Sequence, residues 1–324
     1  MEKSEVKKNI LNVTKIIIFL LVIVISLAAL SPIFKPKNNT KEAGIEYENA
    51  RGFYGEKKNS IDVYAVGNSD LYSAFNPLQL WKEHGNTSYV SAEPQQNTVG
   101  AYYLLKEFLT VQKPKLVILE VDELFTKSNI DDIDDLVSKT LRTYLPIFEY
   151  HSRWKDLSKE DFFSESFYKD RQQTKGYIYH NNVQPYKGSY MNKKRRKDMT
   201  YVTKLYLDKF VKLARDSGAE VMLTVYPSAT TWTVDKHKTV QKYADENKIN
   251  FVDFNIMDDS ETGFNWATDS RDGGNHLNFS GATKMTKYIG QYINSNYKLN
   301  DYRENPEYSQ WDKDYDSFMK KIKK

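Results

Sequence analysis

The longest uninterrupted hydrophobic stretch of the chain lies close to its N-terminus. Residues 16–34 (IIIFLLVIVISLAALSPIF) form a run of 19 residues without a charged side chain. As a helix rising about 1.5 Å per residue, this run would extend roughly 28 Å, which is close to the thickness of the hydrocarbon core of a bilayer. No polar face interrupts it, so the pattern predicts a membrane-spanning helix rather than the core helix of a globular domain.

The residues on either side of this run predict its orientation. Four lysines precede it, at positions 3, 7, 8 and 15. Because positive flanks tend to remain in the cytoplasm, we expect residues 1–15 inside the cell and everything after residue 34 outside it. The run is long for a signal peptide and no clear Ala-x-Ala site follows it, which favours an uncleaved anchor. The sequence therefore predicts a single-pass protein of the cell membrane with an extracellular domain.

Beyond the anchor, short apolar runs alternate with segments of helical spacing. Residues 35–58 are polar and rich in Lys, Asn and Glu, as in a linker. The apolar runs that predict strands are 61–66, 87–90, 115–120, 221–225 and 250–254. The third is almost wholly apolar, as strands buried on both faces of a parallel sheet are. Strands and helices that alternate in this way predict a doubly wound, flavodoxin-like α/β fold with a parallel sheet.

The alternation is interrupted once and ends before the C-terminus. Residues 126–200 are polar and aromatic, and we expect them to form a mostly helical insertion over the active-site edge of the sheet. Residues 300–324 carry scattered aromatic side chains among charges, and we expect this tail to lie against the domain. The predicted extracellular domain thus extends over residues 59–299.

Composition excludes several classes of function. The formal net charge of +4 is too small for a nucleic-acid-binding protein of 324 residues. The chain has no cysteine, which excludes a thiol nucleophile and a Cys-ligated zinc site and suits an exported protein without disulfides. Its 24 tyrosines and 16 phenylalanines include enough aromatic faces for a carbohydrate site, although most are expected to fill the core.

Two short motifs carry the candidate chemistry. Val66-Gly67-Asn68-Ser69 closes the first predicted strand, and Asp272-Gly-Gly-Asn-His276 comes just before the last predicted helix. A serine hydroxyl needs an imidazole to take its proton and a carboxylate to hold that imidazole in the correct tautomer. Ser69, His276 and Asp272 are the residue types for these three roles.

The predicted fold allows the two motifs to meet. Ligands of open α/β sheets bind beyond the carboxyl ends of the strands. Ser69 directly follows the first strand, so it is expected at that edge. His276 lies in a loop that enters the last helix, and such a loop can reach the same edge. We therefore predict a serine nucleophile there with a late Asp/His pair.

A Gly-x-Ser after the first strand and an Asp/His pair before the final helix resemble the SGNH (GDSL-like) hydrolase superfamily. The resemblance covers roughly residues 60–295. Within the superfamily, the N-terminal anchor, the segments KPKLVILE (113–120) and YHSRW (150–154) and the HLNxxGA ending (276–282) look most like anchored proteins of the DltD and AlgX type.

This resemblance implies an extracellular acyltransferase. It would transfer acetyl or D-alanyl groups to a cell-envelope polysaccharide or teichoic acid, and its partner would be a membrane-bound O-acyltransferase. An esterase would use the same residues with water as the acceptor. A non-catalytic polysaccharide-binding protein is the third alternative, although such a protein would not need Ser69, Asp272 and His276 together.

The sequence departs from the family pattern at two points. The family commonly has two residues between Asp and His, whereas three separate Asp272 from His276, so Asp269 is a second candidate for the carboxylate. The family's usual oxyanion-binding Gly and Asn are not at the expected places. Gln96 could donate from its side chain together with the backbone N–H after Ser69, or Gln96 could simply cap the following helix.

Other candidates lie in the insertion. Arg153, beside His151, could clamp an anionic group of the substrate or could pack within the insertion. The cluster Lys193 to Lys197 could contact anionic polymer or lipid, or could simply be solvated. The remaining histidines, His84, His180 and His237, have no partner at metal-ligand spacing, so we expect neither a metal nor another cofactor.

Overall fold

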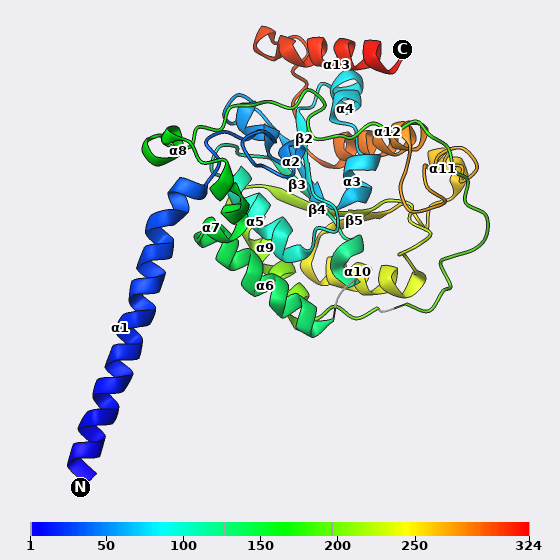
Figure 1. The fold of residues 1–324 in the computed structure, drawn as a ribbon. Coiled ribbons are helices and arrows are strands. Elements are labelled where there is room, and N and C mark those ends of the chain that lie inside the picture. Colours follow the sequence, from blue (N-terminus) through cyan, green and yellow to red (C-terminus); the bar gives the residue numbers. More distant parts are fainter. Residues whose placement is uncertain (1, 126–127, 196, 324) are drawn as a thin grey trace. The chain divides into compact units, whose positions relative to one another are not determined.

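The computed structural model describes residues 2–125, 128–195 and 197–323. The chain divides into two compact units (Figure 1). The first contains residues 1–45 and 137–168, and the second contains residues 46–136 and 169–324. Helix α6 (Asn129–Tyr144) begins in the second unit and ends in the first.

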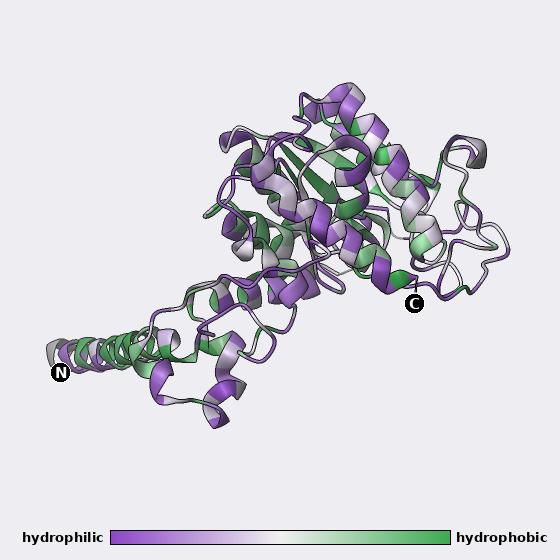
Figure 2. Ribbon diagram, turned by 90° about the horizontal axis from the view of Figure 1, so that it is seen from above, coloured by the Kyte–Doolittle hydropathy of each residue, from purple (hydrophilic) through white to green (hydrophobic). Residues whose placement is uncertain are grey.

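The first unit is built around one long helix, α1 (Glu2–Phe34). Residues 5–34 of α1 are long and apolar enough to cross a membrane, and Figure 2 shows the hydrophobic character along this helix. Almost all of its apolar side chains are exposed, as lipid-facing side chains would be. Short helices pack at its C-terminal end, namely α7 (Ile147–Tyr150), η3 (His151–Lys155) and α8 (Lys159–Phe163).

The second unit contains the predicted parallel sheet. Its five strands, in the order β2-β1-β3-β4-β5, are all parallel to their neighbours. They are β1 (Val63–Gly67), β2 (Ser88–Ala92), β3 (Leu116–Glu120), β4 (Glu220–Val225) and β5 (Asn250–Asp253). Each corresponds to one of the predicted apolar runs, which confirms the predicted α/β class.

Alternate residues of each strand point to opposite faces of the sheet, and helices cover both faces (Figure 1). One face packs against α5 (Thr98–Phe108), α9 (Tyr201–Asp216) and α10 (Val234–Asn247). The other packs against α3 (Ser69–Ala74), α4 (Pro77–His84) and α12 (Phe279–Asn296). The remaining short elements are α2 (Glu48–Arg51), η1 (Gly52–Gly55), η2 (Asp122–Phe125), α11 (Asp259–Thr262) and η4 (Pro306–Tyr308).

Strand order places a ligand-binding crevice next to β1. From β1 the chain goes to β2 on one side and later to β3 on the other. The crossovers therefore leave β1 in opposite directions, which opens a crevice at the carboxyl ends of the strands. Ser69 stands in this position, as the first residue of α3 directly after β1.

The boundaries of the expected segments differ from the structure in two places. Only residues 35–45 of the expected linker lie outside the α/β unit. The rest of it is packed, since Ala50 and Phe53 are fully buried and the Phe53 ring lies 5.1 Å from that of Phe108. The expected insertion is divided, because residues 137–168 belong to the first unit while 169–200 return to the second and are largely irregular.

The C-terminal tail forms a helix, α13 (Ser309–Ile322), that packs on α4. Trp311 is 3% exposed, and its ring lies 5.5 Å from that of Trp81. The Trp81 indole N–H also donates to Asp312 Oδ1 at 3.1 Å. Residues 309–322 are thus an integral part of the second unit.

Candidate active site

Ser69, His276 and Asp272 form a continuous chain of hydrogen bonds. The Ser69 Oγ lies 2.8 Å from Nε2 of His276. The other ring nitrogen, Nδ1, lies 2.5 Å from Oδ2 of Asp272, and the backbone N–H of His276 donates to the other carboxylate oxygen at 2.7 Å. This geometry allows the imidazole to accept the serine proton while the carboxylate holds the opposite edge of the ring.

Two glycines explain how a carboxylate four positions before the histidine reaches its ring. Gly273 and Gly274 have φ values of +78° and +100°, a region that residues with a Cβ rarely adopt. The loop is closed by an antiparallel bridge between Ser270 and Leu277. The chain therefore turns back between Asp272 and His276, and the additional residue of the motif is accommodated within this turn.

Asp269 has a different environment. Its side chain is fully buried and accepts hydrogen bonds from the Lys284 ammonium at 2.7 Å and the Ser280 hydroxyl at 2.7 Å. It also accepts the backbone N–H of Asn265 at 2.8 Å. Asp269 thus joins the loop to the first turns of α12, and the structure places Asp272, not Asp269, against the imidazole.

The electrostatic setting keeps the imidazole neutral near pH 7. Burial lowers the pKa of His276 and the positive charge of Arg271 acts in the same direction, while the hydrogen bond to Asp272 opposes them. The net pKa is below the ordinary value for histidine. Burial works against ionisation of Asp272, but the hydrogen bonds from His276 outweigh it and leave the pKa of this carboxyl lowered. A neutral base beside an ionised carboxylate is the combination that general base catalysis needs.

The Ser69 hydroxyl opens into a cleft of about 560 Å³. The cleft is lined by segments that follow the carboxyl ends of four strands and by the loop that holds His276. The lining residues are Asn68, Ser69, Asp70 and Tyr72 after β1, Pro94 and Gln95 after β2, Asp122 and Glu123 after β3, Thr231 after β4, and Asn275 and His276. A volume of this size is sufficient for a small acyl group together with part of a sugar.

Three buried carboxyl groups lie close to this site, two of them lining the cleft (Asp70 and Asp122) and one lining a small neighbouring cavity (Glu120). Asp70, Glu120 and Asp122 are each at most 6% exposed. Burial raises the pKa of Asp70 and of Glu120 well above the usual values, and the neighbouring carboxyls raise them further. Burial also raises the pKa of Asp122, although Lys236 opposes this shift. These carboxyls therefore ionise less readily than carboxyls in water.

The structure corrects the expectation for Gln96. Its side chain does not line the Ser69 cleft but a separate cavity of about 10 Å³, together with Thr98 and Glu120. Neither amide atom of Gln96 has a hydrogen-bond partner among the described residues. Asn97, rather than Gln96, caps α5 by accepting from the N–H of Gly100 at 2.9 Å. Gln96 is therefore neither a cleft donor nor a helix cap, and a cavity of this volume holds about one water molecule.

The residue before it, Gln95, takes the place in the cleft that the sequence assigned to Gln96. Gln95 has φ of +54° and lies in a turn closed by the hydrogen bond from the Gln96 N–H to the Glu93 carbonyl at 3.2 Å, and the side chains of Gln95 and Gln96 line different cavities. The backbone N–H after Ser69, which the sequence suggested as a second oxyanion donor, belongs to Asp70. It already donates to Asn68 Oδ1 at 2.7 Å. Gln95 is thus the remaining side-chain amide on the β2 side of the cleft.

Arg153 and His151 belong to the first unit, where their contacts are local. The Arg153 guanidinium donates to the carbonyl of Phe34 at 2.5 Å and to Asp161 at 2.8 Å. His151 Nδ1 lies 3.3 Å from the carbonyl oxygen of Phe148. The sequence suggested that Arg153 clamps an anionic group of the substrate. The structure corrects this prediction, because the Arg153 charge is already paired within its own unit.

None of the other expected candidates lines the cleft beside Ser69, although the charge of Arg195 acts on the cleft carboxyl of Asp122. The described residues of the basic cluster, Lys193, Lys194, Arg195 and Lys197, are exposed, while position 196 lies outside the described residues. His237 has a carboxylate partner that its spacing did not indicate, Asp253, at 2.8 Å from Nδ1. Among the described residues, no group of three or more acidic, histidine or cysteine side chains is arranged to hold a metal.

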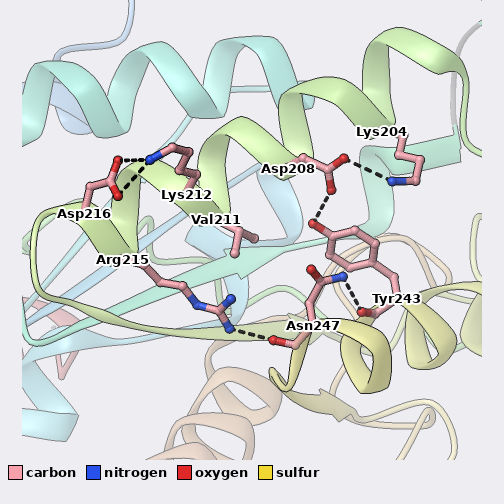
Figure 3. Close-up of a pocket in the computed structure, with 8 residues that line it drawn as sticks. All are labelled: Lys204, Asp208, Val211, Lys212, Arg215, Asp216, Tyr243 and Asn247. Atoms are coloured by element: carbon pink, nitrogen blue, oxygen red, sulfur yellow. Dashed lines mark hydrogen bonds and ion pairs between the residues drawn. The ribbon is translucent and has the colours of Figure 1, made fainter.

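A second surface pocket, of about 490 Å³, lies between α9 and α10 (Figure 3). Its charged residues bind one another: Lys204 pairs with Asp208 and Lys212 with Asp216. The Tyr243 hydroxyl donates to Asp208 at 2.8 Å, and Arg215 donates to the Asn247 carbonyl at 2.7 Å. With these groups satisfied, the pocket offers no nucleophile or base comparable to the serine site.

Solved structures with a similar fold are described as lipolytic or acyl hydrolases. A GDSL-like lipase from Bacteroides thetaiotaomicron is 14% identical, with 72% of this chain and 87% of that chain covered and a TM-score of 0.35. A G-D-S-L family lipolytic protein from Veillonella parvula is 10% identical, with 72% and 98% covered and a TM-score of 0.37. A lipase/acylhydrolase from Enterococcus faecalis is 9% identical, with 74% and 99% covered and a TM-score of 0.38.

No family model matches the chain, and no curated protein matches it. The reaction is therefore inferred from the side chains of this site.

Proposed function

We propose that the chain is a membrane-anchored serine acyltransferase that moves a small acyl group, acetyl or D-alanyl, to a hydroxyl of a cell-envelope polysaccharide or teichoic acid. The observation that carries this proposal is the hydrogen-bonded chain from Ser69 through His276 to Asp272 at the floor of an open cleft. An acyl ester is the substrate class that such a chain attacks at neutral pH.

The reaction would proceed in two balanced steps. In the first, Ser69 Oγ forms a bond to the acyl carbonyl carbon while its proton passes to Nε2 of His276; the donor's alcohol then leaves with that proton. In the second, His276 removes the proton of the acceptor hydroxyl as its oxygen attacks acyl-Ser69. Collapse of this intermediate returns the proton to Ser69 and releases the new ester.

Asp272 would hold Nδ1–H throughout and stabilise the imidazolium that forms in each step. In the tetrahedral intermediates of both steps, Gln95 would donate its side-chain amide to the oxyanion. The position of Gln95 in the cleft supports this role.

The anchor supports a substrate at the cell envelope. A span at residues 16–34 would hold the α/β unit beside the membrane, outside the cell if the N-terminal lysines remain inside. A membrane-bound O-acyltransferase as the source of the acyl donor follows from the resemblance of the sequence motifs alone.

Ester hydrolysis is the second candidate reaction, and the exposure of the site favours it. The Asp272 side chain is 35% exposed, so water can reach the edge of the serine site. Water would then replace the sugar hydroxyl in the second step, with every residue role unchanged.

A partition experiment separates the two reactions. The purified full-length protein is incubated with an activated acetyl ester, with and without a soluble envelope oligosaccharide, and both free acetate and acetylated sugar are measured. A transferase should form acetylated sugar at the expense of acetate, and Ser69→Ala and His276→Ala should each lower turnover by roughly 10⁴. Acetate alone, unchanged by any acceptor, would identify an esterase, and binding of sugar without ester turnover would identify a binding protein.

A further inference from the structure

Five large aromatic side chains are exposed close to the end of the predicted membrane span. Phe148, Trp154, Phe162, Phe163 and Phe167 are 41%, 63%, 55%, 88% and 69% exposed. All belong to the first unit, together with α1. Isolated exposed aromatics are common, but five within 20 residues of sequence are not expected on a surface that faces only water.

These residues belong to a segment that is bound directly to the C-terminal end of α1. The backbone N–H of Ile147 donates to Ser31 Oγ at 3.4 Å, and the Arg153 guanidinium donates to the Phe34 carbonyl at 2.5 Å. Further along, the Ser166 hydroxyl donates to the Pro36 carbonyl at 2.8 Å, and the N–H of Phe167 to the Lys37 carbonyl at 2.8 Å. We call residues 144–168 the juxtamembrane cap.

The contact with Phe34 satisfies a requirement that membrane helices have. The last carbonyls of a helix have no partner within the helix, and near a bilayer an unpaired carbonyl is costly. Arg153 supplies a donor there, and Asp161 holds its guanidinium at 2.8 Å. The positive charge also lies at the end of α1 where the helix dipole is negative, which is the favourable arrangement.

The cap packs on α1 where the charge-free run ends. Side chains from Ile16 to Ile25 are exposed, but Ser31 is only 3% exposed, and the N–H of Ile147 in α7 donates to its hydroxyl. The run of 19 residues is followed by Lys35 and extends roughly 28 Å, close to the thickness of the hydrocarbon. A span formed by this run would therefore place its C-terminal end, and the cap that packs on it, at the membrane interface.

We propose that the juxtamembrane cap is a lipid-binding surface, with Trp154 and the four phenylalanines inserted at the membrane interface on the C-terminal side of α1. Aromatic side chains are enriched at this depth because their rings tolerate both headgroups and acyl chains. The proposal rests on α1 crossing a bilayer and is independent of the chemistry of Ser69.

The charges of the cap indicate how it would bind. Residues 144–168 contain three basic side chains, Arg153, Lys155 and Lys159, and five acidic ones, Glu149, Asp156, Glu160, Asp161 and Glu165, a net charge of −2. The cap itself therefore offers no net positive charge to anionic headgroups. Insertion should depend on the aromatic rings and should be no stronger in anionic than in zwitterionic bilayers.

Fluorescence quenching in vesicles tests this proposal. The full-length protein is reconstituted in phosphatidylcholine vesicles whose acyl chains are brominated either near the headgroup or near the chain end. Emission is compared between the wild type and Trp154→Phe, and the difference gives the signal of Trp154. We expect several-fold stronger quenching of this signal by the shallow bromines than by the deep ones, and protection from iodide in the water. Vesicles containing phosphatidylglycerol should give the same result.

Two variants in the Trp154→Phe background serve as controls. Phe163→Trp places a reporter on α8 and should reproduce the shallow quenching. Ile25→Trp lies in the middle of the predicted span, where an exposed side chain should be quenched most by the deep bromines. If Ile25→Trp is not quenched by lipid, the predicted span is wrong. If it is quenched, but the reporters at positions 154 and 163 respond only to iodide or to neither quencher, the cap faces water or protein and the proposal is overturned.

Discussion

His276 can act as a base only while its imidazole is neutral, so its pKa sets the acid limit of activity. Burial lowers this pKa below the ordinary histidine value of about 6.5. As the pH falls through the lowered pKa, Nε2 is protonated and can no longer accept the Ser69 proton. We expect kcat/KM for an activated ester to stay constant from pH 8 to below about pH 6.5 and to fall only in more acidic solution. A decline that begins above neutral pH would contradict the neutral-imidazole assignment.

The two aspartates near His276 should respond differently to the loss of their charge. Asp272→Asn keeps a hydrogen-bonding group beside Nδ1 but favours the wrong tautomer, so turnover should fall by roughly 10⁴ in a folded protein. Asp269→Asn removes the buried partner of Lys284, and its main effect should be on stability. Turnover and thermal unfolding of both variants give the comparison. An inactive but stable Asp269→Asn protein, beside an active Asp272→Asn protein, would reverse the assignment.

The two adjacent glutamines provide a matched pair for the oxyanion donor. Gln95→Met removes the side-chain amide from the cleft with little change of length, and it should lower kcat by roughly 10² if this amide binds the oxyanion. Gln96→Met fills a site outside the cleft and should leave kcat within a few-fold of the wild type. The single-turnover acylation rates of the two variants test this role. If Gln95→Met and Gln96→Met change the rate equally, Gln95 is not the oxyanion donor.

The sequence was sufficient to predict which side chains meet at the strand ends, but not the side-chain directions that depend on a single backbone angle. Ser69, His276 and Asp272 follow from the chemistry of a serine nucleophile and lie together in the structure. The sequence predicted Gln96 in the cleft, but the structure has Gln95 there. The left-handed backbone conformation of Gln95 is not visible in the sequence.

At the scale of elements, the five strands were predictable because each is a short apolar run with nearby turn signals. The packing of α13 on α4 was less predictable, because it joins residues more than 200 positions apart in the sequence, such as Trp81 and Asp312. A periodic pattern shows that a helix has an apolar face, but not which other face covers it.

This packing predicts that the last helix stabilises the α/β unit. Trp311→Ala removes a nearly fully buried indole from its contact with Trp81 and should cost about 3–5 kcal/mol of unfolding free energy. Lys313→Ala, on the exposed side of the same helix, should change stability by less than about 0.5 kcal/mol. Urea unfolding of the two variants makes the comparison, and equal stabilities would show that α13 contributes little.

At the scale of the whole molecule, the division into units was only partly visible in the sequence. The charge-free run of residues 16–34 predicts an anchor by length alone; α1 contains this run, largely exposed, and continues in the N-terminal direction to Glu2. Residues 137–168 were expected to belong with the α/β domain, but they bind the end of α1 through contacts such as that of Arg153 with Phe34. In such contacts a side chain binds a backbone carbonyl of a distant segment. Every residue has a backbone carbonyl, so the sequence does not indicate which one is bound.

The central claim is that Ser69 carries the acyl group, and peptide mass mapping tests it most directly. The purified full-length protein is mixed with an activated acetyl ester, quenched in acid within the first turnover and digested. We predict a mass increase of one acetyl group on the peptide that contains Ser69, its loss in Ser69→Ala, and its much slower appearance in His276→Ala. Ester turnover with the acetyl group on another residue, or with no acetyl-enzyme at all and an active Ser69→Ala variant, would contradict the account.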